Sequence, residues 1–437
     1  MSHAASRSLR VALLGFGVVG SQVGRLLVNQ AAELSARAGI GLKLIGVAVK
    51  NRQEPAVAAA SSWLPKVTEN AAELLEDCDI AVELIGGVEP ARSLIRQAID
   101  AGASVVTANK ALLAVDGPAL YQAAADAGVD LYYEAAVAGA IPIVRGVRES
   151  LAGDNVQRIL GIVNGTTNYV LDQMTRHDLP YDQALTRAQR LGYAEADPTA
   201  DVEGYDAAAK AAILASLAFH SRVALTDVHR QGITEITSAD VAAAAAGGNV
   251  IKLLAVVEKV TDSNGQAGLI ARVHPALVPV NHPLASVHGA FNAVFVQAEA
   301  AGDLMFYGQG AGGVPTSSAV VGDVVAVARN HLAGVTGPGE TAHAALPALP
   351  IGEATTRYQL RLRVADRPGV LSAVASVFAA QKVSIGEVRQ SAVEGDAADL
   401  VIVTHGAKES ALAATVAQLT SLETVDALTG VMRVEGE

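Results

Sequence analysis

Cysteine is almost absent from this sequence, which contains a single copy, Cys78. One cysteine cannot form an internal disulfide, and no histidine accompanies it at the spacing of a metal site. Aromatic residues make up only 4% of a chain that is 51% hydrophobic, so the core must be built from Ala, Val, Leu and Ile. Positive charge is also scarce. The net charge of −12 argues against nucleic acid or an anionic membrane as a partner.

Long apolar runs are missing too, and the N-terminal residues lack a signal-peptide core. Neither a membrane-spanning helix nor a secreted protein fits this pattern, so we expect a cytoplasmic protein. The length of 437 residues predicts two to four domains.

A glycine-rich turn follows the first apolar segment, at residues 15–20, Gly-Phe-Gly-Val-Val-Gly. Its glycines have the G-x-G-x-x-G spacing, and an amphipathic helix is expected after Gly20. Here the first glycine permits a tight turn, the second lets a pyrophosphate approach the backbone, and the third lets helix and strand pack closely. The N–H groups at the start of the helix then face the phosphates. The turn predicts a dinucleotide site.

The second predicted strand, residues 42–49, ends in Lys50-Asn51-Arg52. Sites that prefer NAD usually have an acidic residue here to hold the ribose 2′-hydroxyl. Two cations suit a 2′-phosphate instead, so Lys50 and Arg52 favour NADP. The alternative is that both are solvated loop charges.

Two further strands are expected, at residues 79–84 and over the short segment 104–110, whose C-terminal end carries Lys110. Ligands of an open parallel sheet bind beyond the carboxyl ends of its strands, which favours a functional over a structural role for Lys110. A helix is expected over 118–127 and a strand over 130–134. The small residues 135–142 then form either a plain turn or, with Glu134, an oxygen site for a hard monovalent cation.

Residues 192–210, Gly-Tyr-Ala-Glu-Ala-Asp-Pro-Thr-Ala-Asp-Val-Glu-Gly-Tyr-Asp-Ala-Ala-Ala-Lys, hold the densest group of reactive side chains. Asp206 and Lys210 share one face of a helix at i,i+4. The simple alternative is a solvated loop and an exposed ion pair. Lys210, however, stands alone in an apolar helix. Burial would move its pKa toward the range of an acid–base catalyst.

The remaining chain predicts a mixed central region and a separate terminal unit. Strands are expected at 156–163, 251–260, 269–273 and 293–297, with helices over 181–191 and 317–331. Residues 307–316 form a second glycine-rich loop, whose backbone closes on a cofactor or supports the sheet. Residues 334–352 are a linker. Beyond it, the order β-α-β-β-α-β is ferredoxin-like.

Together these motifs resemble the homoserine dehydrogenase family over about three quarters of the chain. They are the glycine turn, Thr-Ala-Asn-Lys at 107–110, Asn-Gly-Thr-Thr-Asn-Tyr at 164–169, the carboxylate segment, and Gly-Gln-Gly-Ala-Gly-Gly-Val-Pro-Thr at 308–316. The terminal unit resembles an ACT domain, with Asp-Arg-Pro-Gly-Val-Leu at 366–371. Tyr205 and Gln309 depart from the family pattern.

The resemblance implies an α/β protein with three domains. These are a Rossmann-type domain at 1–140, completed by 305–333, a central α+β catalytic and dimerisation domain at 141–333, and an ACT domain at 357–437 after a linker at 334–356. It also implies NAD(P)-dependent interconversion of homoserine and aspartate 4-semialdehyde, on the route to threonine, methionine and isoleucine. Regulation by threonine and a homodimer or homotetramer are expected.

The resemblance also assigns site residues. The catalytic pair is Lys210 and Lys110. The substrate contacts are Glu195, Asp206, Asp201, Thr166 and Tyr193. The cofactor contacts are Gly15, Phe16, Gly17, Val18, Val19, Gly20, Lys50, Arg52, Thr107, Lys110 and Gly312. A sodium ion is expected at Glu134 and the backbone carbonyls of Val137, Gly139 and Ile141.

Three other functions compete with this one. An acylating semialdehyde dehydrogenase needs a thiolate, and Cys78 stands between acidic residues that raise its pKa. A regulatory NADPH sensor would not need two lysines and a carboxylate cluster in separate segments. Another amino-acid dehydrogenase on the same fold would be recognised by a substrate panel.

Overall fold

The computed structural model describes residues 8–392 and 396–436, and its contacts divide the chain into two compact units. The first unit comprises residues 1–157, 209–225 and 291–345, and the second comprises 158–208, 226–290 and 346–437. The four-segment division expected from sequence is finer and stays a prediction. Residues 1–7, where no signal-peptide core is seen, lie outside the described part. None of the described helices is long and apolar enough to cross a bilayer.

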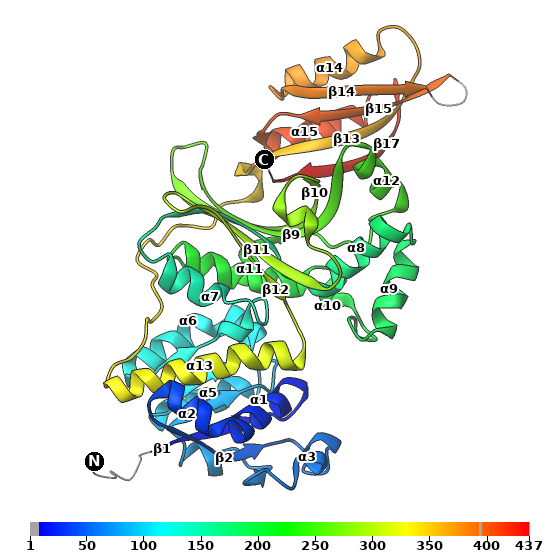
Figure 1. The fold of residues 1–437 in the computed structure, drawn as a ribbon. Helices are drawn as coiled ribbons and strands as arrows, with labels where there is room; N and C mark the ends of the chain where they lie inside the picture. Colours follow the sequence, from blue (N-terminus) through cyan, green and yellow to red (C-terminus); the bar gives the residue numbers. More distant parts are fainter. Residues whose placement is uncertain (1–7, 393–395, 437) are drawn as a thin grey trace. The chain divides into compact units, whose positions relative to one another are not determined.

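A parallel six-stranded sheet forms the centre of the first unit (Figure 1). Its order is β3 (Val67–Thr68), β2 (Gly41–Ala48), β1 (Ser8–Leu14), β4 (Ile80–Glu83), β5 (Ser104–Thr107) and β6 (Leu131–Tyr132). This 3-2-1-4-5-6 order is that of a doubly wound dinucleotide-binding sheet, which confirms the predicted fold class. Ligands of such a sheet bind where the order reverses, beyond the carboxyl ends of β1 and β4.

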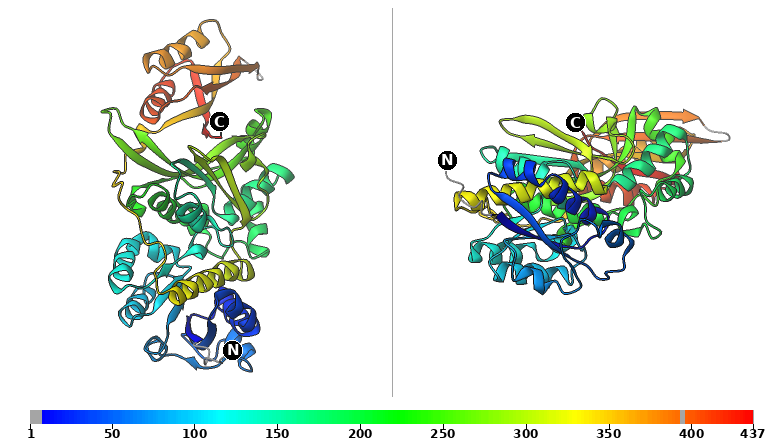
Figure 2. Two further views of the ribbon diagram at one scale, coloured as in Figure 1. Left: turned by 60° about the vertical axis from the view of Figure 1, so that its left-hand side comes forward. Right: turned by 60° about the horizontal axis from the view of Figure 1, so that its bottom comes forward.

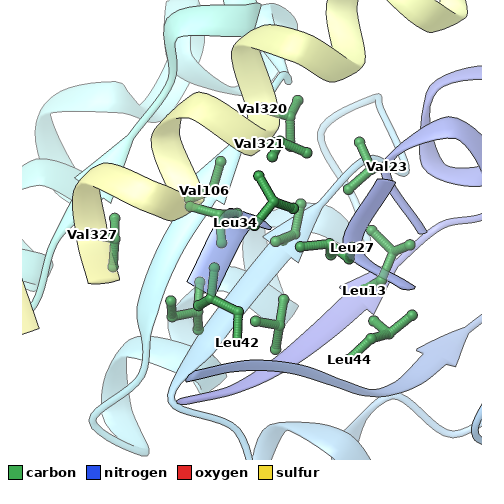
Figure 3. Packing of buried hydrophobic residues seen from close by; sticks show 14 of the residues in the cluster. Leu13, Val23, Leu27, Leu34, Leu42, Leu44, Val106, Val320, Val321 and Val327 are labelled. Atoms are coloured by element: carbon green, nitrogen blue, oxygen red, sulfur yellow. The ribbon is translucent and has the colours of Figure 1, made fainter. Parts of the chain in front are cut away.

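Helices cover both faces of this sheet because successive residues of each strand point to opposite sides. Val11 and Leu13 join one buried cluster, and Ala12 and Leu14 join the other. The first cluster is covered by α1 (Val18–Asn29), α2 (Ala31–Ala38) and α13 (Gly313–Ala333), and the second by α5 (Ala91–Asp100) and α6 (Lys110–Ala127). Figure 3 shows Val320, Val321 and Val327 of α13 packed over the strands, so a segment distant in sequence closes this core.

Two boundaries in the first unit differ from the sequence expectation. Helix α6 begins at Lys110, eight residues before the expected start, because Asn109 caps it by accepting a hydrogen bond from Leu112 N at 3.1 Å. Residues 307–309, read as part of a loop, belong to β12 (Gly302–Gln309), which pairs with β11 (Phe291–Ala298). The shorter elements are α3 (Pro55–Ala60), α4 (Ala72–Leu75), η1 (Glu134–Ala136), α7 (Ile143–Arg145) and η2 (Gly146–Ser150).

A second sheet organises the second unit, in the order β7 (Val156–Ile162), β9 (Asn249–Thr261), β10 (Ala267–Pro279), β17 (Val425–Val434), β13 (Thr355–Ala365), β15 (Ala397–Thr404) and β14 (Ile385–Ala392). β8 (Val228–Arg230) also pairs with β10, and β16 (Ala407–Lys408) with β13. The parallel pairing of β10 with β17 joins the central strands to the terminal ones.

The helices of the second unit fall into two groups. The central group consists of α8 (Gly165–His177), α9 (Tyr181–Arg190), α10 (Thr199–Val202) and α12 (Ser238–Ala246). Helix α11 (Tyr205–Ala218) begins in the second unit and continues in the first. The 3₁₀ turns are η3 (Leu225–Asp227), η4 (Pro283–Ser286) and η5 (Ile351–Glu353). In the terminal segment, α14 (Val370–Ala380) and α15 (Glu409–Leu419) cover one face of the strands, as Figure 2 shows. The β-α-β-β-α-β order is therefore confirmed.

Candidate active site

The glycine turn after β1 has the geometry that its spacing predicts. Gly15 has φ +96°, and a Cβ on it would lie 2.7 Å from Leu84 O. A Cβ on Gly20 would lie 2.3 Å from Gly15 O, so both positions require glycine for packing. A Cβ on Gly17, by contrast, would meet nothing within 4 Å. The open backbone at Gly17 is the surface that a pyrophosphate would approach.

Two helices of the first unit begin beside each other at this turn. Gly17 precedes α1 and Gly312 precedes α13, and neither helix has a side-chain cap. A Cβ on Gly313 would lie 2.7 Å from Val18 O, so the second glycine loop packs on the first. Phe16 is buried against Trp63, Val19 is partly buried, and Val18 is 75% exposed. Uncapped helix starts offer N–H groups to an anion, so these residues fit a dinucleotide phosphate.

The two cations expected to select the cofactor lie in the loop after β2. Lys50 and Arg52 are both exposed. The loop is ordered by Asn51, whose Oδ1 accepts from Gln53 N at 2.8 Å, and by Glu69, whose Oε1 accepts from Arg52 N at 3.0 Å. Both cationic side chains therefore remain accessible at the carboxyl end of β2, where the adenosine ribose of a dinucleotide binds in this fold.

Glu83 is a buried polar residue that the sequence analysis did not single out. Its Oε1 accepts from the N–H groups of Ile85 and Gly86, and its Oε2 accepts from Thr107 Oγ1 at 2.6 Å. Thr107 Oγ1 also accepts from Asn109 N at 3.0 Å. These bonds fix the loops that follow β4 and β5, and with them the start of α6 at Lys110. The sequence feature that could have identified Glu83 is an acidic residue at the end of an apolar strand.

The segment expected to bind sodium contains two buried carboxylates. Glu134 accepts hydrogen bonds from Val144 N at 2.8 Å and Arg145 N at 2.9 Å, and Asp323 accepts from Glu134 N at 2.8 Å. Arg145 forms ion pairs with both side chains. Burial, followed by repulsion from Asp323, raises the pKa of Glu134 to about 7.

Residues 137–141 turn sharply, with φ +56° at Ala138 and +58° at Gly139. A Cβ on Gly139 would lie 2.5 Å from Gly310 O, so the turn packs on the loop after β12. Backbone carbonyls of this segment and the Glu134 carboxylate are hard oxygen donors of the type that alkali and alkaline-earth cations take. The donor set fits the expected ion.

In the second unit, Asn164 brings two of the predicted carboxylates together. Its Nδ2 donates to Asp201 Oδ1 at 2.7 Å and to Asp206 Oδ2 at 2.9 Å. Asn164 lies between β7 and α8, while Asp201 and Asp206 lie on α10 and α11. An asparagine before a helix is a common cap, but such long-range partners leave no signal in the sequence.

The other carboxylates of the segment have different surroundings. Asp197 accepts from Thr199 N and Oγ1 at the start of α10, and these bonds lower its pKa. Glu203 accepts from Thr234 Oγ1 at 3.1 Å. Glu195 is exposed, and its carboxylate makes no hydrogen bond or ion pair within residues 8–392 and 396–436. Two of the five carboxylates are therefore structural, and Asp201, Asp206 and Glu195 remain as candidate ligands.

Thr166 and Tyr193 are also brought together. Thr166 Oγ1 donates to Tyr193 O at 2.6 Å, which anchors the start of the carboxylate segment to α8. The Tyr193 ring packs 4.9 Å from that of Tyr169 and is 47% exposed. Tyr205, which departs from the family pattern, makes a cation–π contact. The guanidinium of Arg230 lies 3.5 Å from its ring centroid.

Lys210 lies on α11, one turn after Asp206, and only 7% of it is exposed. The alternative of an exposed ion pair therefore does not hold for this lysine. A second buried lysine, Lys252, was not anticipated. It donates to Asn168 Oδ1 at 3.1 Å and to Val287 O, and burial lowers its pKa to about 8. Asn168 in turn donates to Val287 O and Gly289 O, so Lys252 anchors α8.

Cys78 has no feature of a nucleophile. The thiol is buried, and burial followed by the charge of Asp79 raises its pKa to about 11. A thiol in this environment is protonated and unreactive at neutral pH. The structure therefore supports rejection of acylating chemistry.

Three family models match this chain. Residues 15–134 match the family described as Homoserine dehydrogenase, NAD binding domain, residues 142–325 match Homoserine dehydrogenase, and residues 358–424 match the ACT domain. Homoserine dehydrogenase of Mycobacterium leprae is 55% identical over 439 residues, with 98% of each chain covered.

Solved structures agree with these matches. The crystal structure of a homoserine dehydrogenase from Thiobacillus denitrificans superposes with a TM-score of 0.91 at 39% identity, and 98% of each chain is covered. A hyperthermophilic archaeal homoserine dehydrogenase in complex with NADPH matches with a TM-score of 0.62 at 26% identity, covering 76% of this chain and 100% of that one. This chain therefore belongs to the homoserine dehydrogenase family of NAD(P)-dependent oxidoreductases and has a C-terminal ACT domain.

Proposed function

We propose that this chain catalyses the reversible, NADPH-dependent reduction of L-aspartate 4-semialdehyde to L-homoserine, on the route to threonine, methionine and isoleucine. The observation that carries the proposal is the arrangement of the carboxylate segment. Asn164 joins Asp201 and Asp206 of this segment by hydrogen bonds, and Asp206 lies one helical turn before the buried Lys210. A substrate with an ammonium group and a carbonyl needs carboxylates for the first and a proton donor for the second. A cytoplasmic location and a dimer or tetramer remain parts of the proposal.

The residues divide the chemistry between binding and proton transfer. Glu195 and Asp206 would bind and orient the ammonium group and the lysine, with Asp201, Thr166 and Tyr193 lining the pocket. Lys210, paired with Lys110, would donate the proton to the carbonyl oxygen. When bound, the nicotinamide would supply the hydride. Burial of Lys210 supports its role, because a side chain held away from solvent on a helix can be positioned against a bound carbonyl.

The cofactor would be held by the two glycine loops and by the loop after β2. Phosphates would meet the uncapped starts of α1 and α13, and Thr107 would lie beside them. We assign Lys50 and Arg52 to the 2′-phosphate of NADPH because both are exposed at the carboxyl end of β2. The complex of the archaeal relative with NADPH supports NADPH as a cofactor.

A sodium ion would be held by Glu134 and the carbonyls of Val137, Gly139 and Ile141. Glu134 and Asp323 share the guanidinium of Arg145, so a bound cation would add a second positive charge to this buried group. We expect NaCl to raise the unfolding temperature above that in choline chloride at equal ionic strength, and Glu134→Ala to abolish the difference. An equal unfolding temperature in both salts would exclude the site.

Product identification tests the reaction itself. The purified protein should convert L-aspartate 4-semialdehyde and NADPH to homoserine, identified by mass spectrometry. A panel of other amino-acid aldehydes and 2-oxo acids should give much slower turnover. Turnover of another substrate with none of the semialdehyde would favour a different amino-acid dehydrogenase. Cofactor binding without turnover of any substrate would favour a sensor.

A further inference from the structure

The side-chain oxygen and nitrogen of Asn164 bind different partners. Its backbone is extended, with φ −125°, and its Oδ1 caps α8 by accepting from Thr167 N at 2.9 Å and Thr167 Oγ1 at 3.0 Å. Its Nδ2 points to the carboxylates of Asp201 and Asp206, at 2.7 and 2.9 Å. Only this orientation of the amide gives every atom a suitable partner, because a flipped amide would place an oxygen against two carboxylates.

The surroundings hold this amide in place. Asn164 is only 5% exposed, and its helix is anchored through Asn168 to Val287 O, Gly289 O and Lys252. Two residues later, Thr166 binds the backbone at Tyr193. The start of α8 and the residue before it therefore contact the carboxylate segment at two places. Thr166 binds it at Tyr193, near its beginning, and Asn164 binds it at Asp201 and Asp206, in its second half. Because the amide is already fixed, little conformational entropy is lost at this position when a substrate binds.

The chemistry of the amide suits two carboxylates that must both stay ionised. Two negative charges close to one atom repel each other, more strongly where water is excluded. An arginine or lysine in this place would stabilise them but would also cancel a charge. A neutral amide donates one N–H to each carboxylate, and a hydrogen bond to an ionised acceptor is among the stronger ones. Both negative charges remain available.

We propose that Asn164 is a positioning residue for this reaction, which holds Asp201 and Asp206 as a pair of ionised carboxylates set to receive the substrate's ammonium group. The proposal rests on the substrate roles of these two aspartates given above. Asn164 contacts neither the carbonyl carbon nor its oxygen in this scheme. Its effect on the rate passes through the placement of its two partners.

Two substitutions separate the positioning role from the capping role. Asn164→Asp keeps the capping oxygen and the shape but turns the donor into a third acceptor. Asn164→Ser also keeps a capping oxygen and removes the donor without adding charge. Ser caps helices about as well as Asn, so the unfolding temperature should change little in Asn164→Ser. Asn164→Asp should unfold at a lower temperature at neutral pH, because it adds a third negative charge at a buried position, and should regain stability as pH falls. Asn264→Asp, in the exposed turn between β9 and β10, is the matched control for added charge.

We expect kcat/KM for aspartate semialdehyde to fall about 10-fold in Asn164→Ser, from the lost hydrogen bonds to charged groups. It should fall about 100-fold in Asn164→Asp, where the carboxylates are also displaced. NADPH affinity, measured by calorimetry, should be unchanged in both. The Asp variant should regain activity as pH falls, because a protonated carboxyl can donate again, whereas the Ser variant should not.

Distinct results separate the failure of this inference from the failure of the proposed function. If the unsubstituted protein does not reduce the semialdehyde, the function is wrong. If it does, and both Asn164 variants keep its kcat/KM and pH profile, the positioning role is wrong. The role is also wrong if both variants lose kcat/KM, NADPH affinity and unfolding temperature together, which would indicate a general structural defect.

Discussion

The carboxylate of Glu435 is buried against the guanidinium of Arg272, with Oε1 3.0 Å from Nη2. Glu435 follows β17, the last strand of the β-α-β-β-α-β segment, and Arg272 lies on the central strand β10. Arg158 and Glu258, both partly buried, complete a network of two positive and two negative charges. His274 lies beside it, and burial lowers the pKa of this imidazole to about 4, so it is neutral. The network joins the residue after β17 to the central strands of the second unit.

Substitution of Glu435 should destabilise the second unit strongly. Glu435→Gln leaves the buried guanidinium of Arg272 and the partly buried one of Arg158 with one carboxylate. Removing one partner of a buried ion pair costs about 3–5 kcal/mol of unfolding free energy. Urea unfolding followed by circular dichroism would measure the loss. Glu33→Gln removes the exposed pair with Arg37 and should cost less than about 1 kcal/mol. Equal losses in the two variants would contradict the role of the network.

The same network predicts an acid limit to stability. Burial alone would raise the pKa of the Glu435 carboxyl, but Arg272 and Arg158 outweigh it and hold that pKa well below its ordinary value of 4.5. A carboxyl whose pKa is lowered by folding stabilises the protein above the pKa of the unfolded state. Its contribution should persist above about pH 5 and be lost as pH falls below that value. In Glu435→Gln this part of the pH dependence should disappear.

Local patterns predicted much of this protein because the decisive features are short in sequence. The turn at Gly15, Gly17 and Gly20 specifies its own geometry, and strand and helix periods gave the β-α-β-β-α-β order. The prediction of a loop starting at Tyr307 was wrong at residues 307–309. These residues belong to β12, which pairs with β11, although the glycines around them are typical of a loop. Propensity does not reveal such pairing.

The partners of buried polar groups could not be predicted. Glu435 and Arg272 are 163 residues apart, and Asn164 lies 37 and 42 residues from its two carboxylates. No local period records such contacts. An asparagine before a helix looks the same whether its nitrogen faces solvent or two aspartates, so the capping role was visible and the bridging role was not.

Cofactor choice should depend on the loop after β2. Arg52→Ala and Lys50→Ala should each raise the KM for NADPH about 10-fold, by loss of a charged contact to the 2′-phosphate, and leave the KM for NADH unchanged. Steady-state kinetics with both cofactors would measure the ratio. Lys43→Ala, on the exposed face of β2, is the matched control and should change neither value. Equal effects on both cofactors would remove these cations from the 2′-phosphate site.

Threonine sensitivity should depend on the loop that precedes α14. Asp366 is exposed there and its Oδ1 accepts from Gln390 Nε2 at 3.3 Å. If threonine binds through this loop, Asp366→Ala should raise the inhibitory concentration at least about 10-fold, since a charged contact to the effector is lost, with uninhibited turnover retained. Glu423→Ala, exposed in the same domain, should leave inhibition unchanged.

A point substitution is preferable here to removal of the terminal domain. Truncation after Gly352 would remove Glu435 and leave Arg158 and Arg272 in the central sheet without it. Loss of inhibition in a truncated chain would then be confounded by loss of stability. Unchanged threonine inhibition in Asp366→Ala would exclude this loop as the effector site.

The central claim, that this carboxylate–lysine arrangement reduces aspartate semialdehyde, is tested most directly at Lys210. Initial rates with the semialdehyde and NADPH, together with NADPH affinity, would be measured for the unsubstituted protein, Lys210→Ala and the exposed control Lys66→Ala. We predict that kcat falls about 10²- to 10⁴-fold in Lys210→Ala, the range of a lost general acid, while NADPH binds as before and Lys66→Ala is unaffected. Undiminished turnover in Lys210→Ala would contradict the account.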